Sequence, residues 1–172
     1  NTTAILTALN DVTVNGGQII VPVGKWRYCN KLTADGGADL NNRFSIRGED
    51  RKASILYYDG TDDTALTVVG AGGHVRSLSM SNLTFKCMPT RIAKGIVIDS
   101  KWAYYTEFQN VDFQDWRLDT ALELDKSYLL AMRNCYFRSC IKAFSLGGAT
   151  PGTNFINATY FDDVSIEFGL ST

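Results

Sequence analysis

The sequence of 172 residues predicts an all-β fold in which the chain winds into stacked coils of parallel strands, a parallel β-helix. Three observations predict it: two short β-rich patterns recur in alternation, they share one range of spacings, and a helix-like segment opens the chain. A repeat whose units each carry one apolar face must bury that face against neighbouring units.

The first segment, residues 1–15, has the pattern of a capping helix. Its apolar residues fall on one helical face: Ile5, Leu9 and Val12. The run Asn15-Gly16-Gly17 ends the helix, and the apolar strand Gln18–Val21 follows it. Because a solenoid needs a cover over its first core end, we expect this helix to supply that cover.

The first repeated pattern has a polar residue at its third position. It occurs at Met80–Phe85, Phe108–Phe113, Met132–Phe137 and Phe161–Ile166. The polar residue steps by 28 (110−82), 24 (134−110) and 29 (163−134). Asparagine tolerates left-handed backbone geometry, and its amide can bond an amide above and below. The sequence therefore predicts a structural ladder of Asn82, Asn110 and Asn134.

The second repeated pattern starts with a small residue and alternates. It occurs at Ala65–Val68, Gly95–Ile98, Ala121–Leu124 and Ala143–Leu146, with steps of 30 (95−65), 26 (121−95) and 22 (143−121). Alternation directs every second side chain to one face, so the following residues are expected in the core: Leu66, Val68, Ile96, Ile98, Leu122, Leu124, Phe144 and Leu146. Each strand is expected to pair in parallel with the next coil, about 4.8 Å away.

The organisation indicated is a single domain over 1–172, with the capping helix at 1–15 and coils at 16–172. Gly169–Thr172 looks like the start of one more small-apolar strand, because 169−143 gives a further step of 26. An open core end exposes strand edges and apolar faces. We therefore expect a fragment truncated mid-coil, or a partner chain or further domain that covers this end.

Composition argues against several classes of protein. The net charge is −1, and 17 basic residues are scattered among 18 acidic ones, so no nucleic acid partner is expected. No run reaches the roughly 18 apolar residues of a membrane helix, so no membrane partner is expected. The four cysteines form no CxxC pair and His74 stands alone, so no metal and no cofactor are predicted. The cysteines are interpreted as buried thiols: Cys29, Cys87, Cys135 and Cys140.

The opening of the chain also carries a family resemblance. Thr2–Leu9 followed by Gly16–Trp26 resembles the start of the pectate-lyase-like superfamily: a helix, a Gly-Gly pair, and an apolar strand ending in Pro-x-Gly-x-aromatic. Phe44–Glu49 with Ala53–Leu56 resembles the next coil of that family. The resemblance implies a right-handed single-stranded parallel β-helix (pectin-lyase-like) with an N-terminal capping α-helix. Within the superfamily the chain is most similar to bacteriophage tailspike proteins.

This resemblance implies a homotrimer on the virion tail that recognises a bacterial surface polysaccharide, such as capsule, O-antigen or exopolysaccharide. It also implies that the full protein can be a polysaccharide depolymerase, either a glycoside hydrolase or a lyase. Because one fold hosts many functions, two alternatives stay open. They are a secreted bacterial polysaccharide lyase or glycoside hydrolase, and a non-catalytic structural or adhesin β-helix.

Three outward carboxylates are the candidate catalytic residues: Asp99, Asp125 and Glu123. The alternation predicts that Asp99 and Asp125 stack on adjacent coils, with Cα atoms about 4.8 Å apart. Two carboxylates that close repel each other, which raises the pKa of one and suits an acid/base pair. The separation is compatible with a retaining glycosidase. The alternative is that both are solvated acids neutralised by Lys101 and Lys126.

Aromatic residues cluster beside this column, and they are the candidate glycan-binding residues: Trp102, Tyr104, Tyr105 and Tyr128. Tyrosine and tryptophan supply large contact areas with few rotatable bonds, and sugar rings stack on their faces. The alternative is that they pack loops against the coil or lie at a trimer interface. Elsewhere, Asp112 falls in an outward column with neutral polar residues, a pattern typical of an exposed carboxylate.

Overall fold

The structure is a computed structural model of the chain that describes all residues other than 1, 36–39, 125–126, 147–155 and 168–172. The described part consists of one helix, α1 (Thr2–Asn15), and eleven strands. The strands are β1 (Gly17–Val21), β2 (Gly24–Tyr28), β3 (Leu32–Asp35), β4 (Leu40–Gly48), β5 (Ser54–Tyr58), β6 (Thr64–Cys87), β7 (Lys94–Gln114), β8 (Thr120–Leu124), β9 (Ser127–Arg138), β10 (Lys142–Leu146) and β11 (Ile156–Glu167).

Every strand pair among the described residues is parallel. The chain returns beside itself at spacings from 22 residues (Leu122 to Phe144) to 35 (Leu40 to Val75). We call each return a rung. The rungs cover residues 17–35, 40–70, 74–100, 102–124, 127–146 and 156–167, and are numbered 1 to 6 in that order.

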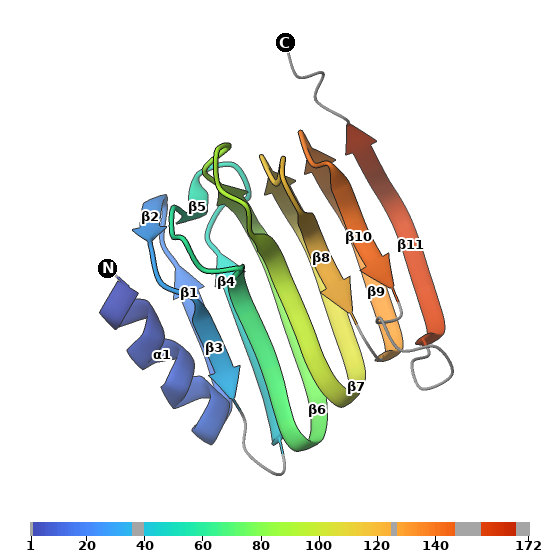
Figure 1. Cartoon of the computed structure of the whole chain (residues 1–172). Helices are drawn as coiled ribbons and strands as arrows, with labels where there is room; N and C mark the ends of the chain where they lie inside the picture. Colours follow the sequence, from blue (N-terminus) through green and yellow to red (C-terminus); the bar gives the residue numbers. More distant parts are fainter. Residues whose placement is uncertain (1, 36–39, 125–126, 147–155, 168–172) are drawn as a thin grey trace.

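The rungs stack in chain order. Figure 1 shows the strands side by side, with α1 at the end of the stack beside β1 and β3, and with β11 at the opposite end. The chain is therefore an all-β structure of parallel strands with one N-terminal helix, as the sequence predicted, and this arrangement is compatible with a β-helix. The helix covers the first core end with Leu9 and Val12, which are both buried.

The register confirms the period read from the second repeated pattern. Leu66 pairs with Ile96, Ile96 with Leu122, and Leu122 with Phe144, which gives the steps of 30, 26 and 22. The inward faces are also as predicted: the first six of the eight expected core residues are at most 1% exposed, and Phe144 and Leu146 are partly buried against the core.

The asparagines of the first repeated pattern are hydrogen-bonded to one another through their side chains. Asn110 Nδ2 donates to Asn82 Oδ1 at 2.9 Å, and Asn134 Nδ2 donates to Asn110 Oδ1. All three have left-handed backbones, with φ of 54°, 54° and 50°. Asp163 continues the left-handed column with φ of 51°, but an ionised carboxylate has no N–H to donate. The acceptor at this end of the ladder, Asn134 Oδ1, receives a hydrogen bond from Arg51 Nη1 at 3.2 Å.

The core of rungs 3 to 5 is aromatic. Phe85, Phe113 and Phe137 occupy one inward column, and Phe113 and Phe137 stack with ring centroids 4.7 Å apart. Trp116, from the turn after β7, stacks on Phe85 at 5.2 Å, and its Nε1 donates to the Phe85 carbonyl at 3.2 Å. Offset and edge-to-face ring pairs of this kind add stability beyond the area they bury.

The prediction of four buried cysteines is wrong for one of them. Cys87, Cys135 and Cys140 are buried, but Cys29 is exposed because it follows the last buried residue of β2 at a turn. Burial, the largest cause, raises the pKa of Cys87 to about 12, of Cys135 to about 11 and of Cys140 to about 12. These three groups therefore stay protonated at neutral pH and are poor nucleophiles.

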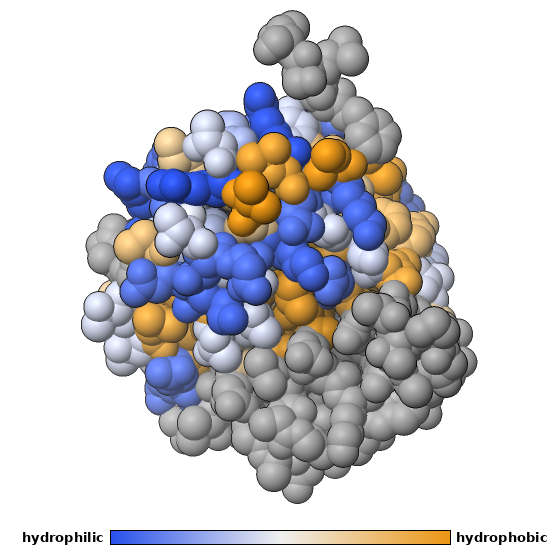
Figure 2. All heavy atoms as spheres, in the orientation of Figure 1, coloured by the Kyte–Doolittle hydropathy of each residue, from blue (hydrophilic) through white to orange (hydrophobic). Residues whose placement is uncertain are grey.

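The surface mixes polar and apolar residues. Figure 2 shows hydrophilic residues over much of the upper part of one face, with smaller hydrophobic patches among them. No helix in the described part of the chain is both long and apolar enough to cross a membrane. The further strand predicted at Gly169–Thr172 lies outside the described residues.

Candidate functional site

Of the three carboxylates predicted to be catalytic, the structure describes the side chain of Glu123 alone. Glu123 lies on β8, where its backbone pairs with Val97 on one side and Ser145 on the other. The backbone of Asp99 pairs with Val69, but the Asp99 side chain is not described, and Asp125 lies outside the described residues. The predicted stacking of the two aspartates therefore stays a prediction.

Glu123 forms an ion pair in the structure. Lys94 Nζ lies 3.0 Å from Glu123 Oε1 and 2.9 Å from Oε2. The hydrogen bond to Glu123 is the largest cause that raises the pKa of Lys94, and burial acts in the opposite direction. Glu123 is therefore held by a lysine of the preceding rung, Lys94. The pairing of Asp99 and Asp125 with Lys101 and Lys126 stays a prediction.

Of the four aromatic residues predicted to bind glycan, one has a described side chain. Tyr105 projects outward from β7 and is 57% exposed. Trp102 and Tyr104 also lie on β7, and Tyr128 lies on β9 between the residues that pair with Ala103 and Tyr105. The strands therefore bring all four backbones to one end of rungs 4 and 5.

Tyr105 belongs to an outer surface that we call the tyrosine face, made of Tyr105, Glu107, Arg133 and Tyr160. Tyr105 and Glu107 lie on β7, Arg133 on β9 and Tyr160 on β11, so the face spans rungs 4 to 6. The backbones of Glu107, Ala131 and Tyr160 pair in one column. Two rungs and two residues separate Tyr105 from Tyr160, which places their Cα atoms about 12 Å apart.

Arg133 contacts two other members of the tyrosine face, Glu107 and Tyr160, and these side chains are open to solvent. Arg133 Nη1 lies 3.5 Å from Glu107 Oε1, with side chains 50% and 43% exposed. The Arg133 guanidinium carbon lies 5.4 Å from the ring centroid of Tyr160, which is 50% exposed. An exposed ion pair contributes only about 0–1 kcal/mol, so a ligand can replace either partner at little cost.

This chemistry suits a polyhydroxylated ligand. Glu107 accepts hydrogen bonds from hydroxyl groups, and Arg133 donates several in one plane. Tyr105 and Tyr160 add two exposed aromatic side chains, and the Arg133 guanidinium lies over the ring of Tyr160. On β6, Ser77, Ser79 and Ser81 present a neighbouring row of short, half-buried side chains.

Sequence reasoning found Tyr105 but missed the other members of the tyrosine face. A signal for two of these members exists in the repeat: Glu107 and Tyr160, like Ala131 between them, stand three residues before the ladder position of their own rung, at 110, 163 and 134. Aligning the rungs on the ladder would have placed Glu107 and Tyr160 in one outward column.

The prediction that Asp112 is an exposed carboxylate is wrong. Its column is as expected, since its backbone pairs with Thr84 and Tyr136, but its side chain is only 2% exposed. Arg51 Nε lies 3.6 Å from Asp112 Oδ1, and Arg138 Nε lies 3.9 Å from Oδ2. The turn between β4 and β5 carries Arg51 over the carboxylate and excludes water from it. Asp112 is therefore part of an internal ion-pair cluster.

Comparisons with known proteins name no relative of this chain: no family model, no curated protein and no solved structure matches it.

Proposed function

We propose that the chain is a right-handed parallel β-helix of the pectate-lyase-like kind, and that it is a tailspike-like domain that recognises a bacterial surface polysaccharide. Support for the fold comes from the parallel register, the asparagine ladder and the helix over the first core end. Support for the function comes from the tyrosine face. One observation carries it: two exposed tyrosines flank an exposed Glu107–Arg133 ion pair on an outer strand surface.

The geometry favours binding to an extended chain over binding to a small molecule. The tyrosine face lies on the outside of three successive rungs, and its aromatic residues are about 12 Å apart along them. A polysaccharide can contact both rings at once through different sugar units. Several weak contacts on one chain then add up, as they do for linked binding modules.

A binding panel tests the proposal. The wild-type protein and the Tyr105→Ala/Tyr160→Ala double variant are titrated with purified capsular, O-antigen and exopolysaccharides by biolayer interferometry. We expect at least one polysaccharide to bind the wild type, and we expect the double variant to bind it at least about tenfold more weakly, equivalent to about 1.4 kcal/mol.

The matched control is Tyr57→Ala. Tyr57 also lies on an outward strand position, where Lys25 Nζ stacks 3.7 Å from its ring centroid, but it belongs to rung 2 on another face. Its loss should leave the affinity within about twofold. Wild-type protein that binds no polysaccharide, or a double variant that binds as well as the wild type, would contradict the proposal.

Depolymerisation of the bound polysaccharide is the catalytic extension of this proposal, with Asp99, Asp125 and Glu123 as its candidate residues. Asp99→Asn and Asp125→Asn should each abolish the release of reducing ends while binding to the tyrosine face persists. A lyase would leave a new carbon–carbon double bond in its product and a hydrolase would not. Unchanged cleavage rates in both variants would remove these two residues from the mechanism.

The proposal also includes assembly as a homotrimer on a virion tail. The chain has a mass of 19.0 kDa, so a trimer has a mass of 57.0 kDa (3 × 19.0). Sedimentation equilibrium distinguishes this species from the monomer. A monomer at every concentration up to the solubility limit would argue instead for a domain that acts alone.

A further inference from the structure

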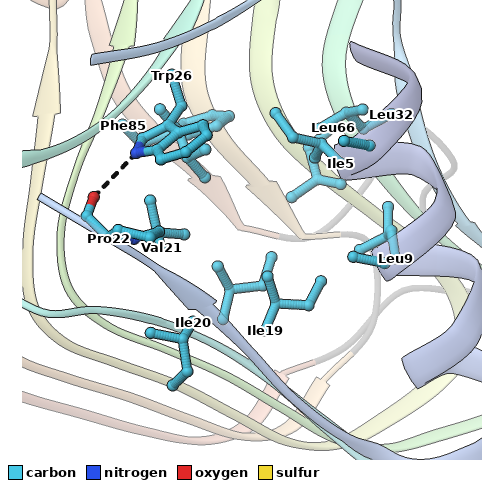
Figure 3. Close-up of a pocket in the computed structure, with 14 residues that line it drawn as sticks. Ile5, Leu9, Ile19, Ile20, Val21, Pro22, Trp26, Leu32, Leu66 and Phe85 are labelled. Carbon is cyan, nitrogen blue, oxygen red and sulfur yellow. Dashed lines mark hydrogen bonds between the residues drawn. The ribbon is translucent and has the colours of Figure 1, made fainter. Parts of the chain in front are cut away.

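A cavity of about 300 Å³ lies between α1 and the first rungs of the stack (Figure 3). It extends from α1 past rungs 1 and 2 to Phe85 of rung 3, so it follows the core axis for roughly 10 Å. Its lining side chains are apolar apart from the Trp26 indole N–H, and they include Ile5 and Ala8 of α1, Ile46 and Leu56 of rung 2, and Phe85 of rung 3.

The cavity exists because the inward columns carry smaller residues in the first rungs. In one column, Phe85, Phe113 and Phe137 follow Leu56, and in a second column Phe108 stands two rungs after Ile46. Trp26 of rung 1 is large, but its indole is tied to the chain before β2. Its Nε1 donates to the Pro22 carbonyl at 2.9 Å, as Figure 3 shows.

The side chains that line the cavity offer water no free partner. Its one polar side-chain atom, Trp26 Nε1, already donates to Pro22. A buried water needs two to four polar partners, and apolar cavities that lack them stay dry and take up apolar molecules. A cavity of roughly 150 Å³ holds benzene, so this one has room for about ten carbons.

We propose that this cavity binds one unbranched alkyl chain of about ten carbons, with the polar end of the ligand in solvent. The cavity walls include the exposed residues Ala4, Ile20 and Pro22, so it opens to solvent beside α1. No charged side chain lines the cavity, so the cavity recognises the alkyl chain of the ligand and not the polar group attached to it. The site is separate from the tyrosine face, and the inference does not depend on the proposed function.

A chain-length series tests the proposal on the wild-type protein. Primary alcohols from hexanol to tetradecanol are titrated by displacement of N-phenyl-1-naphthylamine. Affinity should rise roughly fourfold for each added methylene and level off near ten carbons, where the cavity is full. A rise that continues through tetradecanol indicates partition onto an open surface, and an absence of binding indicates that α1 closes the space. Either result overturns the proposal.

Two ligands with the same ten-carbon chain and different attached groups test whether the cavity recognises the alkyl chain alone. Decanoate represents a free fatty acid, and decylphosphocholine represents the tail of a lipid. Both should bind within about threefold of decanol, because the lining holds no charge. A preference above tenfold for either charged ligand would reveal a headgroup contact and contradict the apolar site as proposed.

Filling the cavity provides the variant test. Ala8 lines the cavity from α1, and the neighbouring Thr7 is exposed on the same helix. Ala8→Leu should weaken decanol binding at least tenfold, and Thr7→Leu should leave it within twofold. Equal binding by both variants would overturn the site. If Ala8→Leu fails to fold, the chain-length series on the wild type decides alone.

Discussion

The first two rungs and the following three share one backbone arrangement but have different cores. Both regions pair in parallel, with the same columns of inward residues. Rungs 3 to 5 fill the main column with phenylalanines that contact one another, whereas rung 2 places Leu56 there and leaves a cavity of about 300 Å³. Strand register and core filling are therefore set by different features of the sequence.

Register follows from turn chemistry and alternation. In rungs 3 to 5 the asparagine ladder fixes one bend, because its members adopt left-handed backbones and hydrogen-bond to one another. How completely the core is filled depends on the side-chain volume at each inward position. A rung can therefore keep its place in the stack and still pack poorly. Three predictions test this separation, and a fourth concerns an ion pair between neighbouring rungs.

The largest effect is expected in the aromatic core. Phe113→Ala removes a ring that contacts Phe85, Phe108 and Phe137, and should lower the free energy of unfolding by about 3–5 kcal/mol. Leu56→Ala should cost less, about 2–3 kcal/mol, because the leucine side chain is smaller and already faces the cavity. Urea unfolding measures both. A greater loss for Leu56→Ala would contradict the contrast between the two cores.

The second-largest loss in the free energy of unfolding is expected in the asparagine ladder. Asn110→Ala removes the hydrogen bonds to Asn82 and Asn134 and places alanine at a φ of 54°. The expected loss is about 3–4 kcal/mol, of which about 1–2 kcal/mol arises from the left-handed backbone. Asn110→Gly should recover that backbone share, since glycine adopts positive φ freely. Equal losses for the two variants would show that the backbone conformation is not part of the ladder's contribution.

Filling the N-terminal cavity should have a smaller and opposite effect. Ala8→Leu is expected to raise the free energy of unfolding by about 0.5–2 kcal/mol, as cavity-filling changes commonly do. Thr7→Leu, on the exposed side of α1, should stay within about 0.5 kcal/mol of the wild type. Thermal unfolding of both variants provides the measurement. Destabilisation by Ala8→Leu alone would mean that the space beneath the helix cannot accept a larger side chain.

The smallest effect concerns the pair of Lys94 and Glu123. Glu123→Gln should cost below about 1 kcal/mol at neutral pH, because the pair is partly exposed. The pKa of Lys94 is raised above its ordinary value of 10.5 in the folded protein, so the contribution is full below pH 10.5 and declines above it. Denaturant titrations of both proteins at several pH values measure this. A difference between them that grows above pH 10.5 would contradict the assignment.

Much of the fold could be predicted because it repeats. The ladder at Asn82, Asn110 and Asn134 and the alternation from Leu66 onward are local patterns with one shared period, so spacing alone sets the strand pairing. The burial of Asp112 could not be predicted, because the side chain that covers it, Arg51, comes from a turn two rungs earlier. The cavity was missed for a related reason, since it depends on the summed volumes of several rungs.

The candidate site was predicted in part. Tyr105 stood out because aromatic residues cluster around it in the sequence, and Glu107 lies on the same strand, but Arg133 and Tyr160 come from two other strands. Only the register brings these residues together. Sites on stacked rungs are therefore found by aligning repeats, and clusters along the chain reveal only the members that share a strand.

The most direct test of polysaccharide recognition is a crystal structure of the protein soaked with an oligosaccharide from the polysaccharide that binds best. The account predicts sugar rings stacked on Tyr105 and Tyr160, with hydroxyl groups within hydrogen-bonding distance of Glu107 and Arg133. An oligosaccharide bound along β8 beside Glu123, with the tyrosine face empty, would contradict it.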